Sequence, residues 1–324
     1  MKSERAKLDM METVDTLGYR MMAAVESALL GQRRAVELAI CCFFAGGHLL
    51  IEDVPGVGKT TLAKALARAC GGEFRRIQFT ADLLPADITG VSVWDAKAGD
   101  FRFKRGPLFG NIVLADEINR STPKTQSALL EAMSEKSVSV DGSPTSLPEP
   151  FMGIATQNEQ ERHGTYPLPE SQLDRFLMRI SMGYPSPEAE RLVVSRKSMA
   201  DPVSAVGLVV RPETHAAITE AVDEVYVDPE ILDYIMEIVR RSRKSDLLTL
   251  GVGPRGGMAL HRAARALAFL RERDFCLVDD VRELLIPVLA HRIIPANGGF
   301  GPSGSRRSAE RVLSEILSEV EIPI

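Results

Sequence analysis

The chain has 324 residues, of which 45% are hydrophobic and 26% are charged, as in ordinary folded proteins and unlike disordered ones. Its net charge of −5 lacks the basic excess that nucleic-acid phosphates usually require, so we expect no nucleic-acid partner. Charged and glycine residues interrupt the most apolar stretch, residues 35–51, and the four cysteines form no CxxC pair. We therefore expect a cytoplasmic protein with no membrane span, export signal or zinc site.

Short apolar runs alternate with helical patterns in the first half of the chain. After two amphipathic helices, which end near Gly31 and Phe44, five such runs are bounded by turn or helix signals: 48–51, 75–80, 112–116, 151–156 and 176–182. Helical patterns at 61–70 and 124–134 lie between them. This alternation is typical of a parallel sheet with helices on both faces, so we predict an α/β domain with five buried strands.

The α/β pattern ends at Tyr184-Pro185-Ser186-Pro187-Glu188, where a serine cap and a proline favour the start of a helix. Almost all of the chain beyond it is helical in pattern. Asp228 is predicted to begin one of these helices, and Asp279 is predicted to cap another. We therefore predict an α/β domain over residues 1–184 and a helical domain over residues 185–324.

A candidate phosphate-binding loop joins the first strand to the next helix, in the run Glu52-Asp53-Val54-Pro55-Gly56-Val57-Gly58-Lys59-Thr60-Thr61. The glycines allow backbone N–H groups to surround a β-phosphate. Lys59 would neutralise phosphate oxygens, and Thr60 would offer its hydroxyl to Mg²⁺. The residues predicted to bind ATP here are Asp53, Val54, Pro55, Gly56, Val57, Gly58, Lys59, Thr60 and Thr61.

Asp53 departs from the P-loop pattern, which has glycine at this position. The departure weakens the match unless the first turn of the loop tolerates a side chain that points away from the phosphate. The alternative is a glycine-rich turn between a strand and a helix that binds nothing.

Two further elements support the P-loop. The run Asn111-Ile112-Val113-Leu114-Ala115-Asp116-Glu117 is an apolar strand that ends in two carboxylates, the Walker B pattern. Asp116 is predicted to hold Mg²⁺ through water, and Glu117 to orient and deprotonate the attacking water. The next strand ends in Gln157-Asn158, so Asn158 could fix the same water near the γ-phosphate. Solvated turn acids and a simple Asx turn are the alternatives.

Three longer runs, QFTADLLPADITG, RGPLFGNIVLADEINRSTPKTQSALLEAM and GTYPLPESQLDRF, together resemble the MoxR family of AAA+ ATPases, and the likeness covers about residues 31–255. The resemblance implies a P-loop domain with a parallel five-stranded sheet and a C-terminal α-helical lid domain. It also implies ring assembly, commonly as hexamers, with ATP sites between subunits. A helix-2 insertion at about 83–110 and a pre-sensor hairpin at about 137–148 would face the ring pore.

The same resemblance assigns roles to three polar residues. Asn158 corresponds to sensor 1, and Arg175 looks like an arginine finger that reaches the γ-phosphate held by a neighbouring subunit. Such an arginine can contribute roughly 10³ to 10⁵ in rate. The alternative for Arg175 is a local surface pair with Asp174, which is worth little. Arg255 resembles sensor 2, an arginine at a helix start that faces the nucleotide, although the residues flanking it differ from those usual in the family.

These features predict an ATPase that uses ATP and Mg²⁺ in a chaperone-like motor acting on client proteins. The usual clients of the family carry von Willebrand factor A domains, so the resemblance implies such a partner. Two alternatives stay open: a slowly hydrolysing binding switch controlled by nucleotide, and a DNA-handling ATPase, which the acidic charge disfavours. A kinase is disfavoured because Glu117 suits a water nucleophile.

Overall fold

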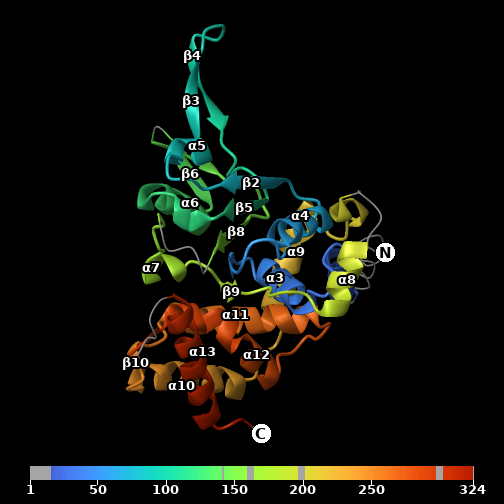
Figure 1. Cartoon of the computed structure of the whole chain (residues 1–324), viewed down its shortest axis with the longest axis vertical. Coiled ribbons are helices and arrows are strands. Elements are labelled where there is room, and N and C mark those ends of the chain that lie inside the picture. Colours follow the sequence, from blue (N-terminus) through green and yellow to red (C-terminus); the bar gives the residue numbers. More distant parts are fainter. Residues whose placement is uncertain (1–15, 141, 159–163, 196–200, 297–301, 324) are drawn as a thin grey trace, which may run out of the picture.

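The computed structural model describes residues 16–140, 142–158, 164–195, 201–296 and 302–323. Its first domain is built on a five-stranded sheet (Figure 1). In spatial order the strands are β2 (Phe74–Gln78), β5 (Ile112–Asp116), β8 (Met152–Gln157), β1 (Leu49–Glu52) and β9 (Met178–Ile180). All neighbouring strands are parallel. The predicted α/β domain with a five-stranded parallel sheet is confirmed, but β2 is an edge strand and is mostly exposed instead of buried.

Because the strands are parallel, all their carboxyl ends lie at one edge of the sheet. Glu52 pairs with Gln157, and Gln78 pairs with Asp116. We call this the carboxyl edge; the P-loop, Glu117 and Asn158 follow it directly in the chain. The opposite edge, where β1 and β9 begin, we call the amino edge.

Successive strand residues supply two separate apolar clusters, as the alternation of side chains along a strand requires. Leu49 and Ile51 belong to one cluster, and Leu50 belongs to the other. The first cluster is completed by α2 (Leu17–Glu26), α3 (Arg33–Phe44) and α4 (Lys59–Ala69). The second is completed by α5 (Pro85–Thr89) and α6 (Pro123–Glu135). Helices therefore cover both faces of the sheet (Figure 1).

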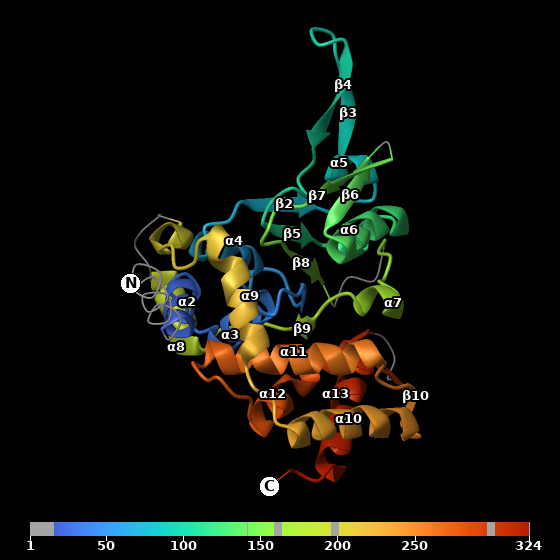
Figure 2. The same cartoon turned by 180° about the vertical axis from the view of Figure 1, so that it is seen from behind.

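Two antiparallel hairpins lie in the regions of the predicted insertions. One pairs β3 (Gly90–Asp95) with β4 (Asp100–Arg105) and projects from the domain at the end opposite the lid (Figures 1 and 2). The exposed rings of Trp94 and Phe101 meet near its tip, with centroids 5.2 Å apart. The other pairs β6 (Ser137–Val140) with β7 (Ser143–Ser146), and Asp141 at its turn lies outside the described residues.

The segment after β9 returns to the sheet domain before the lid begins. Its elements are α8 (Pro187–Ser195), η2 (Pro202–Ala205), η3 (Pro212–Thr214) and α9 (His215–Glu224). Ser186 Oγ accepts a hydrogen bond from the N–H of Ala189 at 3.3 Å, in agreement with the predicted cap. The N–H of Val209 donates to the carbonyl oxygen of Ala69 in α4 at 2.8 Å. A domain boundary at 184/185 stays a prediction, since this segment packs on the first domain.

The lid is a helical domain with a small two-stranded sheet. It contains α10 (Pro229–Lys244), β10 (Leu248–Leu250), α11 (Pro254–Leu270), α12 (Val278–Leu289), η4 (Ala290–Arg292), β11 (Ile294–Pro295) and α13 (Pro302–Glu319). Asp228 caps α10 as predicted, because its carboxylate accepts from the N–H of Glu230 at 2.9 Å. The predicted cap at Asp279 is wrong. The carboxylate of Asp280 instead accepts from the N–H of Leu277 at 2.8 Å, one residue further along.

The lid and the sheet domain share one apolar core. The first cluster runs without a break from α3 into α11 and α12. Phe44 and Phe269 meet within it, with ring centroids 5.5 Å apart. Within one chain the two domains are therefore firmly packed together. Among the helices of the described residues, none combines the length and apolar character needed to cross a bilayer.

His48, directly before β1, links three elements of the sheet domain. Its Nδ1 accepts a hydrogen bond from the N–H of Gly153 at 3.0 Å, and its Nε2 lies 2.9 Å from the carbonyl oxygen of Met133. Both contacts are satisfied by a neutral ring that carries its proton on Nε2. Burial is the main cause that lowers the pKa of His48 to about 4.

This lowered pKa predicts a loss of stability in mild acid. The stabilisation from the neutral ring is fully present above the ordinary histidine pKa near 6.5, and it is lost progressively as the pH falls from there through the folded-state pKa of about 4. Between pH 7 and pH 5 the loss should be about 2 kcal/mol of unfolding free energy. Urea unfolding of the wild type and of His48→Asn at pH 7 and pH 5 measures this loss of unfolding free energy, which should be smaller in the variant. Equal losses in the two proteins would contradict the prediction, because His291, also buried, is present in both.

Candidate functional site

The loop between β1 and α4 has the backbone geometry of an anion-binding turn. Gly56 and Gly58 have φ values of 87° and 101°, in the left-handed region that side chains disfavour. At Gly58 a Cβ would also lie 3.3 Å from the side chain of Leu29. α4 begins at Lys59, so its first N–H groups and the positive end of its dipole are directed into the loop. Backbone donors and a lysine thus converge at the carboxyl edge, as a phosphate group requires.

Lys59 lies across the mouth of this loop. Its ammonium group is 2.5 Å from the carbonyl oxygen of Asp53 and 3.5 Å from that of Gln157. The Asp53 side chain is buried and points away from the loop, toward the segment after β9. This is the arrangement under which aspartate is tolerated at a P-loop glycine position.

Asp116, at the end of β5, has partners on both neighbouring strands. One carboxylate oxygen accepts from Thr156 Oγ1 at 2.6 Å, and the other accepts from the Arg76 guanidinium at 2.6 Å. Thr60, the second residue of α4, supplies a hydroxyl at the same edge. Carboxylate and hydroxyl oxygens are hard donors that suit Mg²⁺ held partly through water. Any such ion would share Asp116 with Arg76, a residue that no sequence motif had indicated.

Glu117 follows Asp116 in a left-handed conformation, with φ 56° and ψ 49°. Its N–H donates to Thr156 Oγ1 at 2.9 Å, which stabilises this backbone geometry. Its carboxylate accepts from Gln78 Nε2 at 2.9 Å and pairs with Arg120 at 3.1 Å. The side chain is therefore held at the carboxyl edge by the last residue of β2 and by Arg120, three residues further along the chain.

Asn158 comes directly after β8, whose last residues pair with both β5 and β1. The topology therefore places Asn158 at the edge that carries Lys59, Asp116 and Glu117. These four residues are predicted site residues, and the structure brings the segments that carry them together.

Arg175 lies at the amino edge instead. It precedes β9, and its guanidinium donates to the carbonyl oxygen of Leu130 at 2.6 Å and to Ser134 Oγ at 2.9 Å, both in α6. The four-residue strand β1 separates this edge from the P-loop by roughly 13 Å. The structure does not bring Arg175 to the P-loop of its own chain.

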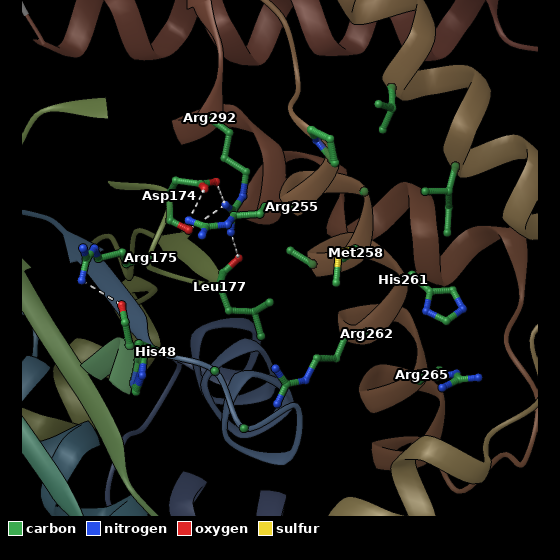
Figure 3. A pocket seen from close by; sticks show the side chains of 18 of the residues that line it. His48, Asp174, Arg175, Leu177, Arg255, Met258, His261, Arg262, Arg265 and Arg292 are labelled. Atoms are coloured by element: carbon green, nitrogen blue, oxygen red, sulfur yellow. Dashed lines mark hydrogen bonds and ion pairs between the residues drawn. The ribbon is translucent and has the colours of Figure 1, made fainter. Parts of the chain in front are cut away.

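Arg255, the second residue of α11, lies on the same side as Arg175. Its guanidinium is 3.7 Å from Asp174, and its side chain is 79% exposed. Asp174 also forms an ion pair with Arg292 of the lid (Figure 3). Arg292 donates a further hydrogen bond to the carbonyl oxygen of Phe176 at 2.7 Å. Asp174 is thus bound to lid arginines, while Arg175 is bound to α6.

These arginines line a cavity of about 800 Å³ between the sheet domain and the lid (Figure 3). Its charged lining residues are Lys136, Asp174, Arg175, Asp223, Arg243, Arg255, Arg262, Arg265 and Arg292. Cations outnumber anions strongly, so the cavity attracts negative charge. Arg262 and Arg292 escaped sequence reasoning because each lies within a helical pattern that carries no motif.

Comparison with known proteins adds independent information. Residues 48–178 match the family model described as "ATPase family associated with various cellular activities (AAA)", and residues 240–316 match an AAA lid domain. The chain is 46% identical to the uncharacterized protein YeaC of Bacillus subtilis, over 93% of each chain. It is 38% identical to the chaperone MoxR1 of Mycobacterium tuberculosis, over 94% of this chain and 82% of that protein. A crystal structure of a putative ATPase from Cytophaga hutchinsonii superposes with a TM-score of 0.86 at 34% identity, covering all of both chains.

Proposed function

The chain belongs to the MoxR family of AAA+ ATPases, and from this premise we propose that it binds ATP with Mg²⁺ at the carboxyl edge and hydrolyses it to drive the remodelling of client proteins. One observation carries the proposal. The P-loop turn at Gly58 and Lys59 lies at the same edge of the sheet as Asp116 and Glu117, with only the end of β8 between them. The residues for binding a phosphate and for activating a water thus lie at one edge.

Each residue has a definite task in this proposal. Bound ATP supplies the phosphoanhydride bond, and Mg²⁺ neutralises charge on its oxygens. Lys59 and the N–H groups of the loop hold the phosphates, while Thr60 and Asp116 hold the ion. Glu117 orients the water and takes its proton, and Asn158 fixes the position of that water. The positions 53–61 proposed from the sequence all belong to this loop and the first turn of α4.

The two arginines at the amino edge support sites shared between subunits. Arg175 lies at the opposite edge of the sheet from its own P-loop. We therefore propose that it reaches ATP on a neighbouring subunit of a ring, and that the ring is a hexamer, as is usual in the family. Arg255 lies on the same side, and we propose that it also faces the neighbour's nucleotide. Since lid and sheet domain share a core within one chain, the movement driven by hydrolysis would occur mainly between subunits.

The projecting β3–β4 hairpin supports a role in client contact. It extends away from the sheet and the lid (Figure 2), and its Trp94 and Phe101 are exposed to solvent. We propose a cytoplasmic client protein, and the family resemblance points to one with a von Willebrand factor A domain. A nucleotide-controlled binding switch is the second candidate, because the cavity arginines would recognise a neighbour's ATP whether or not it is hydrolysed.

Shared sites make the rate per subunit depend on protein concentration. ATP turnover with Mg²⁺, measured over a wide range of protein concentrations, is expected to rise steeply as rings assemble and then to level off. Sizing at the same concentrations should show assembly over the same range. A constant rate in a protein that sizing shows to be monomeric would contradict shared sites. ATP binding without turnover in assembled rings would favour the switch.

A further inference from the structure

Asp53 has an unusually complete set of hydrogen bonds for an aspartate in a phosphate-binding loop. It is 7% exposed, and its Oδ2 accepts from Ser181 Oγ at 2.9 Å and from the N–H groups of Met182 and Gly183 at 2.6 and 2.7 Å. Its Oδ1 accepts from the N–H of Val54 at 2.8 Å. A buried carboxylate is costly unless its oxygens are satisfied, and here both are.

The backbone of Asp53 joins this contact to the phosphate-binding machinery. Its N–H donates to the carbonyl oxygen of Gln157, at the end of β8, at 3.2 Å. Its own carbonyl oxygen accepts from Lys59 Nζ at 2.5 Å. One residue thus holds the end of β8, the P-loop lysine and the segment 181–183 in a common arrangement.

The segment 181–183 is itself well anchored. Gln32 donates to the carbonyl oxygen of Gly183 at 3.0 Å, and Gly183 has a φ of 67° that favours glycine. Met182 also packs beside the other end of the P-loop, since a Cβ on Gly58 would lie 3.7 Å from its Cε. Both ends of the loop therefore rest on the same short segment.

We propose that Asp53 is a positioning residue for ATP binding, which fixes the first turn of the P-loop against segment 181–183 and so pre-organises the loop and Lys59 for phosphate. The inference deepens the proposed function and rests on it. Without the contacts between Asp53 and segment 181–183, the loop would adopt the conformation that directs its N–H groups at the phosphate for only a fraction of the time. The apparent dissociation constant for ATP rises by the inverse of that fraction.

The sharpest test restores the glycine that the P-loop pattern has at this position. If glycine were optimal here, Asp53→Gly would bind ATP as well as wild type or better. The proposal expects the opposite: the dissociation constant and KM for ATP rise about tenfold or more, while kcat at saturation changes less than about threefold. Asp53→Asn, which keeps one acceptor oxygen for segment 181–183, should lie between wild type and Asp53→Gly. The matched control is Asp246→Gly at an exposed turn, which should leave both constants unchanged.

A second variant keeps the test decisive if Asp53→Gly folds poorly. Ser181→Ala removes one donor to the carboxylate and should raise KM in the wild-type background, and by a smaller factor in the Asp53→Asn background, where the acceptor is uncharged. Thermal unfolding without nucleotide verifies the fold of every variant. Unchanged KM in the folded Asp53 and Ser181 variants, or a loss confined to kcat, would overturn the inference and leave the proposed function intact. A wild-type protein that binds no ATP would instead overturn the proposed function.

Discussion

A Glu117→Gln variant is expected to bind ATP about as tightly as wild type and to hydrolyse it about a thousandfold more slowly, because a general base typically contributes 10² to 10⁴ in rate. Glutamine keeps the size of the side chain and can still meet Gln78 through its amide. The left-handed backbone at Glu117 is held by Thr156 and is unaffected by the change. The substitution therefore isolates the proton-accepting carboxylate.

Turnover and nucleotide affinity should be measured on the same preparations of Glu117→Gln. Glu220→Gln, on the exposed surface of α9, is the matched control and should retain wild-type turnover. Turnover that falls less than about tenfold in Glu117→Gln would show that another group accepts the proton. A large loss of ATP affinity in this variant would show that Glu117 contributes to ATP binding and not only to hydrolysis.

Removal of the proposed arginine finger is the second change with a large expected effect. Arg175→Ala should lower turnover about a thousandfold, because an arginine supplied in trans stabilises charge on the transferred phosphoryl group. ATP affinity should change much less, since Arg175 lies away from the P-loop of its own chain. Ser134→Ala, which removes one contact of Arg175 but leaves its guanidinium, is the control. It should retain most of the wild-type turnover.

Mixed rings distinguish action in trans from action within one chain. An Arg175→Ala subunit has an intact P-loop and Glu117, and a Glu117→Gln subunit has an intact Arg175. In a random equal mixture, about a quarter of the interfaces combine the intact parts, so activity should return although each variant alone is inactive. No recovery in rings that sizing shows to be mixed would contradict a finger in trans.

Much of the fold could be predicted because its signals are local. The apolar runs that became β1, β5 and β8 are short and bounded by turns, and Asp228 caps its helix within two residues. Helix starts were less certain where two acids are adjacent. Asp279 was predicted to cap α12, but the helix begins at Val278, which puts both acids inside its first turn. The carboxylate of Asp280 is the one that accepts from the N–H of Leu277.

The sequence by itself was enough to predict the residues of the P-loop and of the Walker B strand, because the glycines, the lysine and the paired acids follow spacings of a few residues. Only the tertiary structure decided which groups Asp53 and Arg292 contact. The partner Gly183 lies 130 residues from Asp53, and Asp174 lies 118 residues from Arg292. Such contacts leave no periodic trace in a sequence, since they form only when the packing of strands and helices brings distant segments together.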